Sequence, residues 1–276
     1  MNYAQLFSHY ESKLDEVGEE PESLAYTFRA LKKLTLTDFV LLLTKEVTKD
    51  DENLLELIFQ QLAHHYPAQY IIGKADFHGL ELMVDPRVLI PRPETEELVD
   101  LILAENPTEN LSVLDIGTGS GAIAISLVKA QPNWKVTATD ISLDALAVAQ
   151  ENAHKQQVQL SFIKSDVWEN IDGPFDMIVS NPPYIAREDV EEVGLNVLHS
   201  EPHIALFADE DGLVIYRQIA KRAAEFLTEK GKVYLETGYK QGQQVKDIFQ
   251  TAFPEKRVRV LKDQFGQDRM VVVDDG

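Results

Sequence analysis

The spacing of apolar positions changes along the chain, and it predicts helices first. Up to about residue 70 apolar residues recur every three or four positions, most clearly from Leu54 to Leu62. That spacing places apolar side chains on one face of a helix, and Asp50-Asp51 and Pro67 provide start and stop signals for it. Thr37-Asp38 precede a similar short run. Residues 1–75 are therefore expected to form a small helical bundle.

Residues 76–92 show a different pattern, in which apolar and polar positions partly alternate. The alternation covers residues 77–84, Asp85-Pro86 provide a turn, and the apolar run Val88-Leu89-Ile90 follows. Alternation with a period of two indicates a half-buried strand. We therefore expect this segment to be a β-hairpin that links two domains.

From residue 93 onward, short apolar runs alternate with helical patterns. The expected strands cover residues 112–116, 135–139, 160–164, 177–179, 232–236, 258–261 and 270–273, and the expected helices cover residues 94–104, 122–130, 143–152, 213–227 and 241–252. Repeated strand–helix units predict an α/β fold with a doubly wound, mostly parallel sheet covered by helices on both faces. The last two strands are joined too tightly for a parallel crossover, which predicts an antiparallel strand at the sheet edge.

Composition narrows the class of protein. The 276 residues include no cysteine, which excludes disulfides and thiolate metal sites. His64-His65 lack partners at metal-ligand spacing, so no metal is expected. The N-terminus has no apolar core of a signal peptide, and the most apolar stretch, residues 39–43, is too short to span a bilayer. These features predict a cytoplasmic protein without a membrane partner, and we expect a monomer.

The charge is strongly acidic in both parts of the chain. Residues 1–75 hold 12 acidic and 7 basic side chains, a net charge of -5, so residues 76–276 carry the other -15 of the total of -20. A protein that binds duplex nucleic acid needs lysines and arginines to neutralise phosphates, and the only basic cluster is the short run at 256–259. Direct nucleic acid binding is therefore not expected. An acidic surface suits a basic protein partner or serves solubility alone.

A glycine-rich loop follows the first strand expected in the large sheet. Asp115 and Ile116 lead into the loop Gly117-Thr118-Gly119-Ser120-Gly121, and Asp140 ends the next strand. Glycines permit a sharp turn and close approach of a ligand to the backbone, and open α/β sheets bind ligands at the carboxyl ends of their strands. A carboxylate at position 140 can accept hydrogen bonds from a ribose diol, so the pattern predicts a cofactor that contains adenosine.

The loop by itself leaves the cofactor open. Gly117-x-Gly119-x-x-Ala122 also fits the dinucleotide fingerprint, so NAD is a competing cofactor, and a tight turn without any ligand is the plainest alternative. The arrangement Asp-x-Gly-x-Gly-x-Gly, which begins at Asp115, is common in methyltransferases. It favours S-adenosyl-L-methionine as the cofactor.

The motif Asn181-Pro182-Pro183-Tyr184 ends the strand expected near residues 177–179. Two prolines cannot continue a strand and make the turn rigid. The Asn181 side-chain oxygen and a nearby carbonyl, expected to be that of Pro182, can accept both hydrogens of a planar NH2 group and orient its nitrogen toward a methyl donor. Tyr184 can stack on the flat acceptor group. The motif predicts methylation of an amide or exocyclic amine nitrogen, although an Asn-capped strand terminator would look the same.

Several separated motifs together make the chain resemble the peptide chain release factor glutamine N5-methyltransferases, the HemK/PrmC-like family. They cover residues 67–73, 77–79, 88–96, 115–121, 181–184, 201–202, 211–213 and 263–269. The segment Val88-Leu89-Ile90-Pro91-Arg92-Pro93-Glu94-Thr95-Glu96 is the most discriminating of them, because nucleic acid methyltransferases share the Asn-Pro-Pro-Tyr turn but lack this segment.

The resemblance implies a helical substrate-binding domain at 1–75, a β-hairpin linker at 76–92 and a class I, Rossmann-like methyltransferase domain at 93–276. It implies that the enzyme methylates the glutamine of the Gly-Gly-Gln motif in peptide chain release factors, its protein partners. Trp168 would lie beside the cofactor adenine. Whether Asp166 and Arg92 touch the cofactor stays open, as a solvated acid and a structural ion pair are equally good readings of them.

The resemblance further implies a role for each motif residue. Gly117, Thr118, Gly119, Ser120, Gly121, Asp140, Trp168 and Asn181 would hold the cofactor; Asn181, Pro182, Pro183 and Tyr184 would hold the glutamine, with Asn181, Pro182 and Tyr184 taking part in catalysis.

Three other functions compete with this one. An adenine-N6 or guanine-N2 nucleic acid methyltransferase would need a basic groove or an inserted recognition domain, and the sequence offers neither. A non-catalytic adenosine sensor would not need an intact Asn181-Pro182-Pro183-Tyr184 motif. An NAD enzyme would be distinguished by the cofactor that raises its melting temperature.

Overall fold

The computed structural model describes residues 1–107 and 110–276, which group into two compact units. The first unit comprises Met1–Lys74 together with Val193–Glu201, and the second comprises Ala75–Glu192 with Pro202–Gly276. The boundary between Lys74 and Ala75 lies one residue from the predicted one. The segment at 193–201 groups with the first unit although it follows residue 93 in the sequence.

The first unit is a helical bundle, as the helical spacing predicts. Its helices are α1 (Tyr3–Glu16), α2 (Glu22–Lys32), α3 (Leu36–Leu42), α4 (Lys49–Ala63), α5 (Ala68–Ile72) and, from the later segment, α9 (Leu195–Ser200). The side chains of Asn2, Thr35 and Thr48 cap α1, α3 and α4 by accepting from backbone N–H groups of their first turns. Leu14, Phe28 and other apolar residues of the helices form one buried cluster.

The predicted hairpin is present, but its turn lies elsewhere. Strands β1 (Lys74–Phe77) and β2 (Leu80–Met83) form a two-stranded sheet. Their connection is His78-Gly79, with φ of 48° and 73°, and a type I′ turn requires positive φ at both central residues. Asp85-Pro86 is therefore not the hairpin turn, and residues 88–90 are not a strand.

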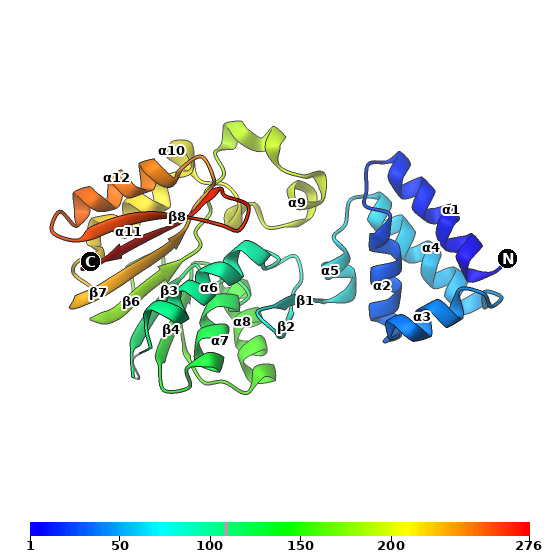
Figure 1. Cartoon of the computed structure of the whole chain (residues 1–276), viewed down its shortest axis with the longest axis horizontal. Helices are drawn as coiled ribbons and strands as arrows, with labels where there is room; N and C mark the ends of the chain where they lie inside the picture. Colours follow the sequence, from blue (N-terminus) through cyan, green and yellow to red (C-terminus); the bar gives the residue numbers. More distant parts are fainter. Residues whose placement is uncertain (108–109) are drawn as a thin grey trace. The chain divides into compact units, whose positions relative to one another are not determined.

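The second unit contains the large α/β sheet (Figure 1). Its remaining elements are α6 (Pro93–Glu105), β3 (Ser112–Ile116), α7 (Ala122–Ala130), β4 (Lys135–Asp140), α8 (Leu143–Gln156), β5 (Ser161–Lys164), β6 (Phe175–Ser180), the 3-10 helices η1 (Arg187–Glu192) and η2 (His203–Ala205), α10 (Asp209–Gly212), α11 (Val214–Ala223), β7 (Leu227–Glu236), α12 (Gly242–Ala252), β8 (Arg257–Lys262) and β9 (Asp268–Asp274). The strand order is β5-β4-β3-β6-β7-β9-β8. The predicted doubly wound, mostly parallel sheet is confirmed.

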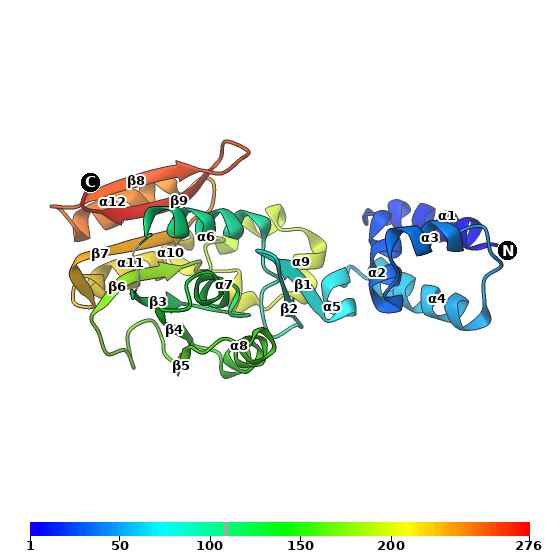
Figure 2. The ribbon, with the colours of Figure 1, turned by 60° about the horizontal axis from the view of Figure 1, so that its bottom comes forward.

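The antiparallel strand lies one position inside the sheet edge. β9 runs antiparallel to both β7 and β8, and β8 forms the edge itself. The tight connection at Asp263–Gln267 explains why β8 and β9 pair, but it does not determine which of them contacts β7. Figure 2 shows β5 and β8 at the two ends of the sheet.

Alternate residues of the strands face two different helical layers. On one face Val113, Met177 and Tyr234 pack in a buried cluster with residues of α6 and α7. On the other face Leu114 and Ile178 pack with residues of α11 and α12. Burial of both faces explains why neighbouring residues in the middle of these strands, Val113-Leu114 in β3 and Met177-Ile178-Val179 in β6, are all apolar.

Candidate active site

A cavity of about 330 Å³ opens at the carboxyl ends of β3, β4 and β6. Parallel pairing places Ile116 of β3 opposite Thr139 of β4 and Ser180 of β6. The residues that follow these three, Gly117, Asp140 and Asn181, therefore lie at the same edge of the sheet, and all line the cavity. The strand order reverses at β3, which is where open α/β sheets bind ligands.

Backbone hydrogen bonds and glycines shape the loop after β3. The N–H groups of Gly117 and Thr118 both donate to the Thr139 carbonyl, at 2.9 and 2.8 Å. Gly117 and Gly119 have φ of 73° and 55°, and a Cβ added to either would meet no other atom within 4 Å. These two glycines thus combine a left-handed backbone with open space in which a ligand can approach.

A glycine is needed at position 121 for a different structural reason, which is close helix packing. A Cβ added there would lie 2.8 Å from Ile125 Cδ1 and 3.2 Å from Ala149 Cβ, so the glycine lets the start of α7 pack closely against α8. Gly121 is not among the described residues that line the cavity, whereas Gly117, Thr118, Gly119 and Ser120 are.

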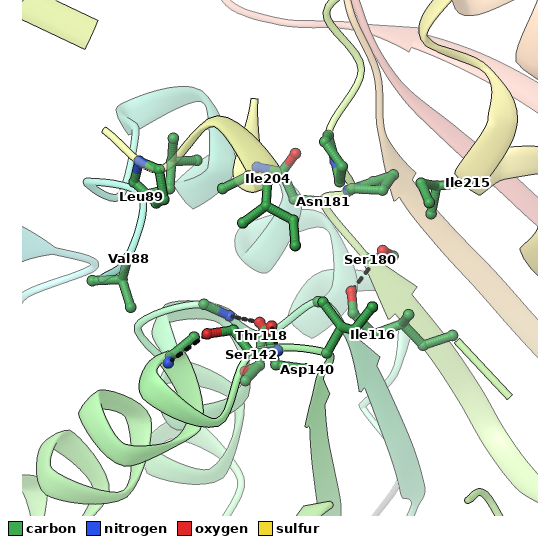
Figure 3. A pocket seen from close by; sticks show the side chains of 18 of the residues that line it. Val88, Leu89, Ile116, Thr118, Asp140, Ser142, Ser180, Asn181, Ile204 and Ile215 are labelled. Atoms are coloured by element: carbon green, nitrogen blue, oxygen red, sulfur yellow. Dashed lines mark hydrogen bonds between the residues drawn. The ribbon is translucent and has the colours of Figure 1, made fainter. Parts of the chain in front are cut away.

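Asp140 faces the cavity from the end of β4. Its Oδ2 accepts from the Gly119 N–H and its Oδ1 from the Ser142 N–H, both at 2.9 Å. Each carboxylate oxygen keeps a further lone pair for a ligand hydroxyl. Burial raises the pKa of Asp140, and the two backbone hydrogen bonds oppose that shift. Figure 3 shows Asp140 and Ser142 at one wall of the cavity, with Asn181 and Ile204 at another.

Asp115, before the loop, is fully buried and does not line the cavity. Its Oδ2 accepts from the Thr118 hydroxyl at 2.6 Å. Burial raises the pKa of Asp115 to about 7, because the charged form is poorly solvated there. This hydrogen bond joins the end of β3 to the glycine loop and stabilises the turn between them.

The motif after β6 is held on two sides. Asn181, Pro182 and Pro183 line the cavity, and the Tyr184 carbonyl accepts from Gln241 Nε2 at 2.9 Å. The Tyr184 side chain packs on the core beneath α11 rather than lining the cavity. Burial raises its pKa to about 12. The predicted stacking of Tyr184 on an acceptor group stays a prediction.

Two site residues have no role assigned from the sequence. They are Thr95, which lies within the segment at 88–96 that carries the family resemblance, and Glu236. Thr95 lies in the first turn of α6 and lines the cavity, while Glu236 is the last residue of β7 and is 1% exposed. The Thr95 hydroxyl donates to Glu236 Oε2 at 2.6 Å, and Asn181 Nδ2 donates to Thr95 Oγ1 at 3.2 Å. A polar residue at the end of a buried strand was the available signal for Glu236.

Trp168 is placed away from the cavity. Its ring stacks on Phe226, with centroids 4.6 Å apart and planes 7° apart, and its Nε1 donates to the Gln218 carbonyl at 2.9 Å. Val167, the preceding residue, lines the cavity instead. The structure therefore gives Trp168 a core-packing role, and the expected contact with an adenine ring finds no support in it.

The residues whose role was left open lie at the cavity wall. Asp166 and Arg92 both line it, as do Ile141 and Ile204. Ile141 and Ile204 are 45% and 59% exposed, which is unusual for residues of this type and leaves an apolar surface for a flat ligand group. Ile141 lies in the loop after β4 and Ile204 lies in η2, and neither position gave a signal of this exposure in the sequence.

No cluster of three or more potential metal ligands occurs among residues 1–107 and 110–276. Over the same residues, no helix has both the length and the apolar character needed to cross a bilayer.

Solved structures share the fold of the second unit. A methyltransferase from Pyrococcus furiosus matches with a TM-score of 0.54 and 22% identity over 72% of this chain and 90% of its own. A ribosomal protein L11 methylase from Lactobacillus delbrueckii subsp. bulgaricus matches with a TM-score of 0.50 and 24% identity over 66% of this chain and 79% of its own. Family models described as "Methyltransferase small domain" and "PrmC N-terminal domain" match residues 95–204 and 5–73.

The doubly wound sheet, with a glycine loop and an acidic residue at the ends of its first two strands, defines a class I methyltransferase. A release factor glutamine methyltransferase of Streptococcus pneumoniae is 63% identical over 100% of this chain and 99% of its own length, and one of Lactococcus lactis is 51% identical over 92% and 94%. This chain belongs to the release factor glutamine methyltransferase family.

Proposed function

We propose that this protein transfers a methyl group from S-adenosyl-L-methionine to the side-chain amide nitrogen (N5) of the glutamine in the Gly-Gly-Gln motif of peptide chain release factors. One observation carries the proposal. The wall formed by Asn181, Pro182 and Pro183 and the wall formed by the glycine loop and Asp140 belong to a single cavity. A donor held at one wall therefore lies within reach of an amide held at the other.

The residues of the glycine wall fit an adenosine cofactor. The backbone at Gly117 and Gly119 borders open space, and Asp140 presents carboxylate oxygens that can accept from two ribose hydroxyls. Ile141 and Val167 offer apolar surface for the adenine. When bound, the cofactor supplies an electrophilic methyl group on a positively charged sulfur.

The residues of the proline wall would orient the acceptor. A glutamine amide is a weak nucleophile because its nitrogen lone pair is delocalised into the carbonyl. Asn181 Oδ1 and the Pro182 carbonyl would accept its two hydrogens and fix the nitrogen in line with the methyl carbon. S-adenosyl-L-methionine would supply the methyl group to the nitrogen held by Asn181 and Pro182, and the methylated nitrogen would release one of its two protons to solvent. A strong base is not needed, because alkylation makes that proton acidic.

The proposal extends to partners and domains. The helical unit at the N-terminus, residues 1–75 in the sequence-based division, would bind the release factor, the linker at 76–92 would follow it, and residues 93–276 would carry the chemistry. The relatives are named for release factors, and the net charge of -20 opposes contact with nucleic acid phosphates. Neither observation favours the alternative function, an adenine-N6 or guanine-N2 nucleic acid methyltransferase. We further propose a monomer in the cytoplasm.

Transfer of a labelled methyl group tests this function. The purified protein is incubated with labelled S-adenosyl-L-methionine and, separately, with a release factor, RNA or DNA. The expected result is label in the release factor alone, and loss of that label with Asn181→Ala while the variant still binds the cofactor. Label in nucleic acid but not in the release factor would overturn the proposal.

A further inference from the structure

Thr95 lies between Asn181 and Glu236 in a chain of hydrogen bonds at the cavity wall. Its hydroxyl is 2.6 Å from Glu236 Oε2 and 3.2 Å from Asn181 Nδ2. Thr95 is 4% exposed and Glu236 is 1% exposed. Water therefore cannot readily replace either bond, and a lost partner leaves a buried polar group unsatisfied.

The direction of each bond follows from the chemistry of a hydroxyl. Thr95 has a single O–H proton, and the short distance to the Glu236 carboxylate assigns that proton to this bond. The hydroxyl oxygen can then only accept from Asn181. It selects the NH2 end of the Asn181 carboxamide and leaves Oδ1 turned away from Thr95.

We propose that Thr95 and Glu236 are positioning residues that hold the Asn181 carboxamide in the one orientation that offers an oxygen to the substrate NH2. The inference rests on the proposed function. The two ends of a carboxamide have nearly the same shape, so cavity walls alone do not choose between them. A flipped Asn181 would present NH2 to NH2 and lose the hydrogen bond that orients the nucleophile.

Glu236 sits among charged and titratable groups from several elements. Burial raises its pKa to about 7; the Thr95 hydrogen bond, the Arg269 charge and a hydrogen bond with Asn181 oppose that shift, and the Glu94 charge adds to it. Tyr184 also lies near, and the Tyr216 hydroxyl donates to the backbone carbonyl of Glu236 at 2.7 Å. Protonated Glu236 could donate to Thr95 and release the Thr95 proton toward Asn181. The orientation should therefore be held best above the pKa of Glu236.

Two replacements of Thr95 separate the effect of its hydroxyl group from the effect of its side-chain volume. Thr95→Val keeps the volume and removes both hydrogen bonds, whereas Thr95→Ser keeps the hydroxyl. Thr228→Val is the matched control, because Thr228 does not line the cavity and its half-buried hydroxyl also donates to a carboxylate, Asp176 Oδ1, at 3.2 Å. Initial rates of release factor methylation give kcat and the KM for S-adenosyl-L-methionine, and melting temperatures report folding.

The inference predicts that Thr95→Val lowers kcat by about 10- to 100-fold with little change in the cofactor KM. Thr95→Ser should stay close to wild type, and Thr228→Val should lower the melting temperature without lowering kcat. Glu236→Gln gives a second measurement that does not depend on Thr95→Val folding. Its amide does not titrate, so the substitution should remove the rise of kcat as pH increases through about 7.

A wild-type kcat in Thr95→Val, or a wild-type pH dependence of kcat in Glu236→Gln, would overturn the inference while leaving the proposed function intact. An equal loss of kcat in Thr95→Ser and Thr95→Val would also overturn it, because volume rather than hydrogen bonding would then matter. If the wild-type protein itself does not methylate the release factor, the proposed function fails, and the inference that rests on it fails too.

Discussion

A methyl group added to Gly212 would lie 2.0 Å from the carbonyl oxygen of Tyr184. Gly212 ends α10 with φ of 79°, and Gln241 Nε2 donates to both the Tyr184 carbonyl and the Asp211 carbonyl, at 2.9 and 2.8 Å. The backbone of Tyr184 therefore packs directly against Gly212, where there is no room for a side chain. In this way residues 211–213 hold the backbone of the motif at 181–184 in position.

Gly212→Ala should therefore displace the proline motif. Overlap with the backbone at Tyr184 cannot be relieved by rotating a side chain, so we expect kcat for methylation to fall by more than about tenfold and the melting temperature to fall. Gly266→Ala is the matched control. Gly266 has φ of 78° with no atom within 4 Å of an added Cβ, so it carries only the cost of a left-handed backbone, about 1–2 kcal/mol. Equal kcat in the two variants would contradict this explanation.

Asp140→Asn should weaken cofactor binding by about 10- to 100-fold, since hydrogen bonds to a charged group contribute about 1.5–3 kcal/mol. Isothermal titration with S-adenosyl-L-methionine measures the effect. Asp144→Asn makes the same change at an exposed position in the first turn of α8 and should leave the dissociation constant unchanged. Similar dissociation constants for wild type and Asp140→Asn would remove Asp140 from the site.

Trp168→Phe tests whether the indole touches the cofactor. Its ring stacks on Phe226 and its Nε1 bonds to the Gln218 carbonyl, so the substitution should lower the melting temperature by loss of that hydrogen bond. The dissociation constant for S-adenosyl-L-methionine should change by less than about twofold, because Trp168 does not line the cavity. A much larger loss of cofactor affinity would restore the sequence-based assignment of Trp168 to the adenine.

Stability should depend on pH through Asp115. Its pKa is raised by burial from 3.8 to about 7. Between these values the folded protein binds a proton that the unfolded chain has released, so the free energy of unfolding falls as pH rises through this range. Asp115→Asn removes this contribution. Urea unfolding between about pH 4 and pH 8 should show a smaller loss of stability with rising pH in the variant, and parallel curves for the two proteins would be inconsistent with a raised pKa.

The fold was largely predictable from periodicity, because most elements have one strong pattern. The sequence predicts a strand at 112–116 and a helix at 122–130, and these are the bounds of β3 and α7. The hairpin turn was misplaced, because Asp85-Pro86 is a stronger turn signal in composition than His78-Gly79. The position of β9 inside β8 was not predictable, since pairing between the two strands leaves their order in the sheet undetermined.

The sequence could predict those parts of the candidate site that directly follow the ends of paired strands. Gly117, Asp140 and Asn181 each follow a strand end, so a parallel sheet alone brings them together. Thr95 and Glu236 are 141 positions apart, and only the completed fold shows that their side chains meet. Trp168 shows that a position near a strand end is not sufficient, because its place just after a strand does not determine the direction in which its ring points. The roles assigned to the site residues stay predictions.

The decisive experiment for the proposed reaction is tandem mass spectrometry of a release factor after incubation with the protein and S-adenosyl-L-methionine. We expect the peptide containing Gly-Gly-Gln to gain the mass of one methyl group in place of a hydrogen, with fragment ions that place it on the glutamine side chain. No modified peptide should form with Asn181→Ala. A methyl group on another residue, or an unmodified Gly-Gly-Gln peptide after incubation with protein that binds the cofactor, would show that this protein does not methylate that glutamine.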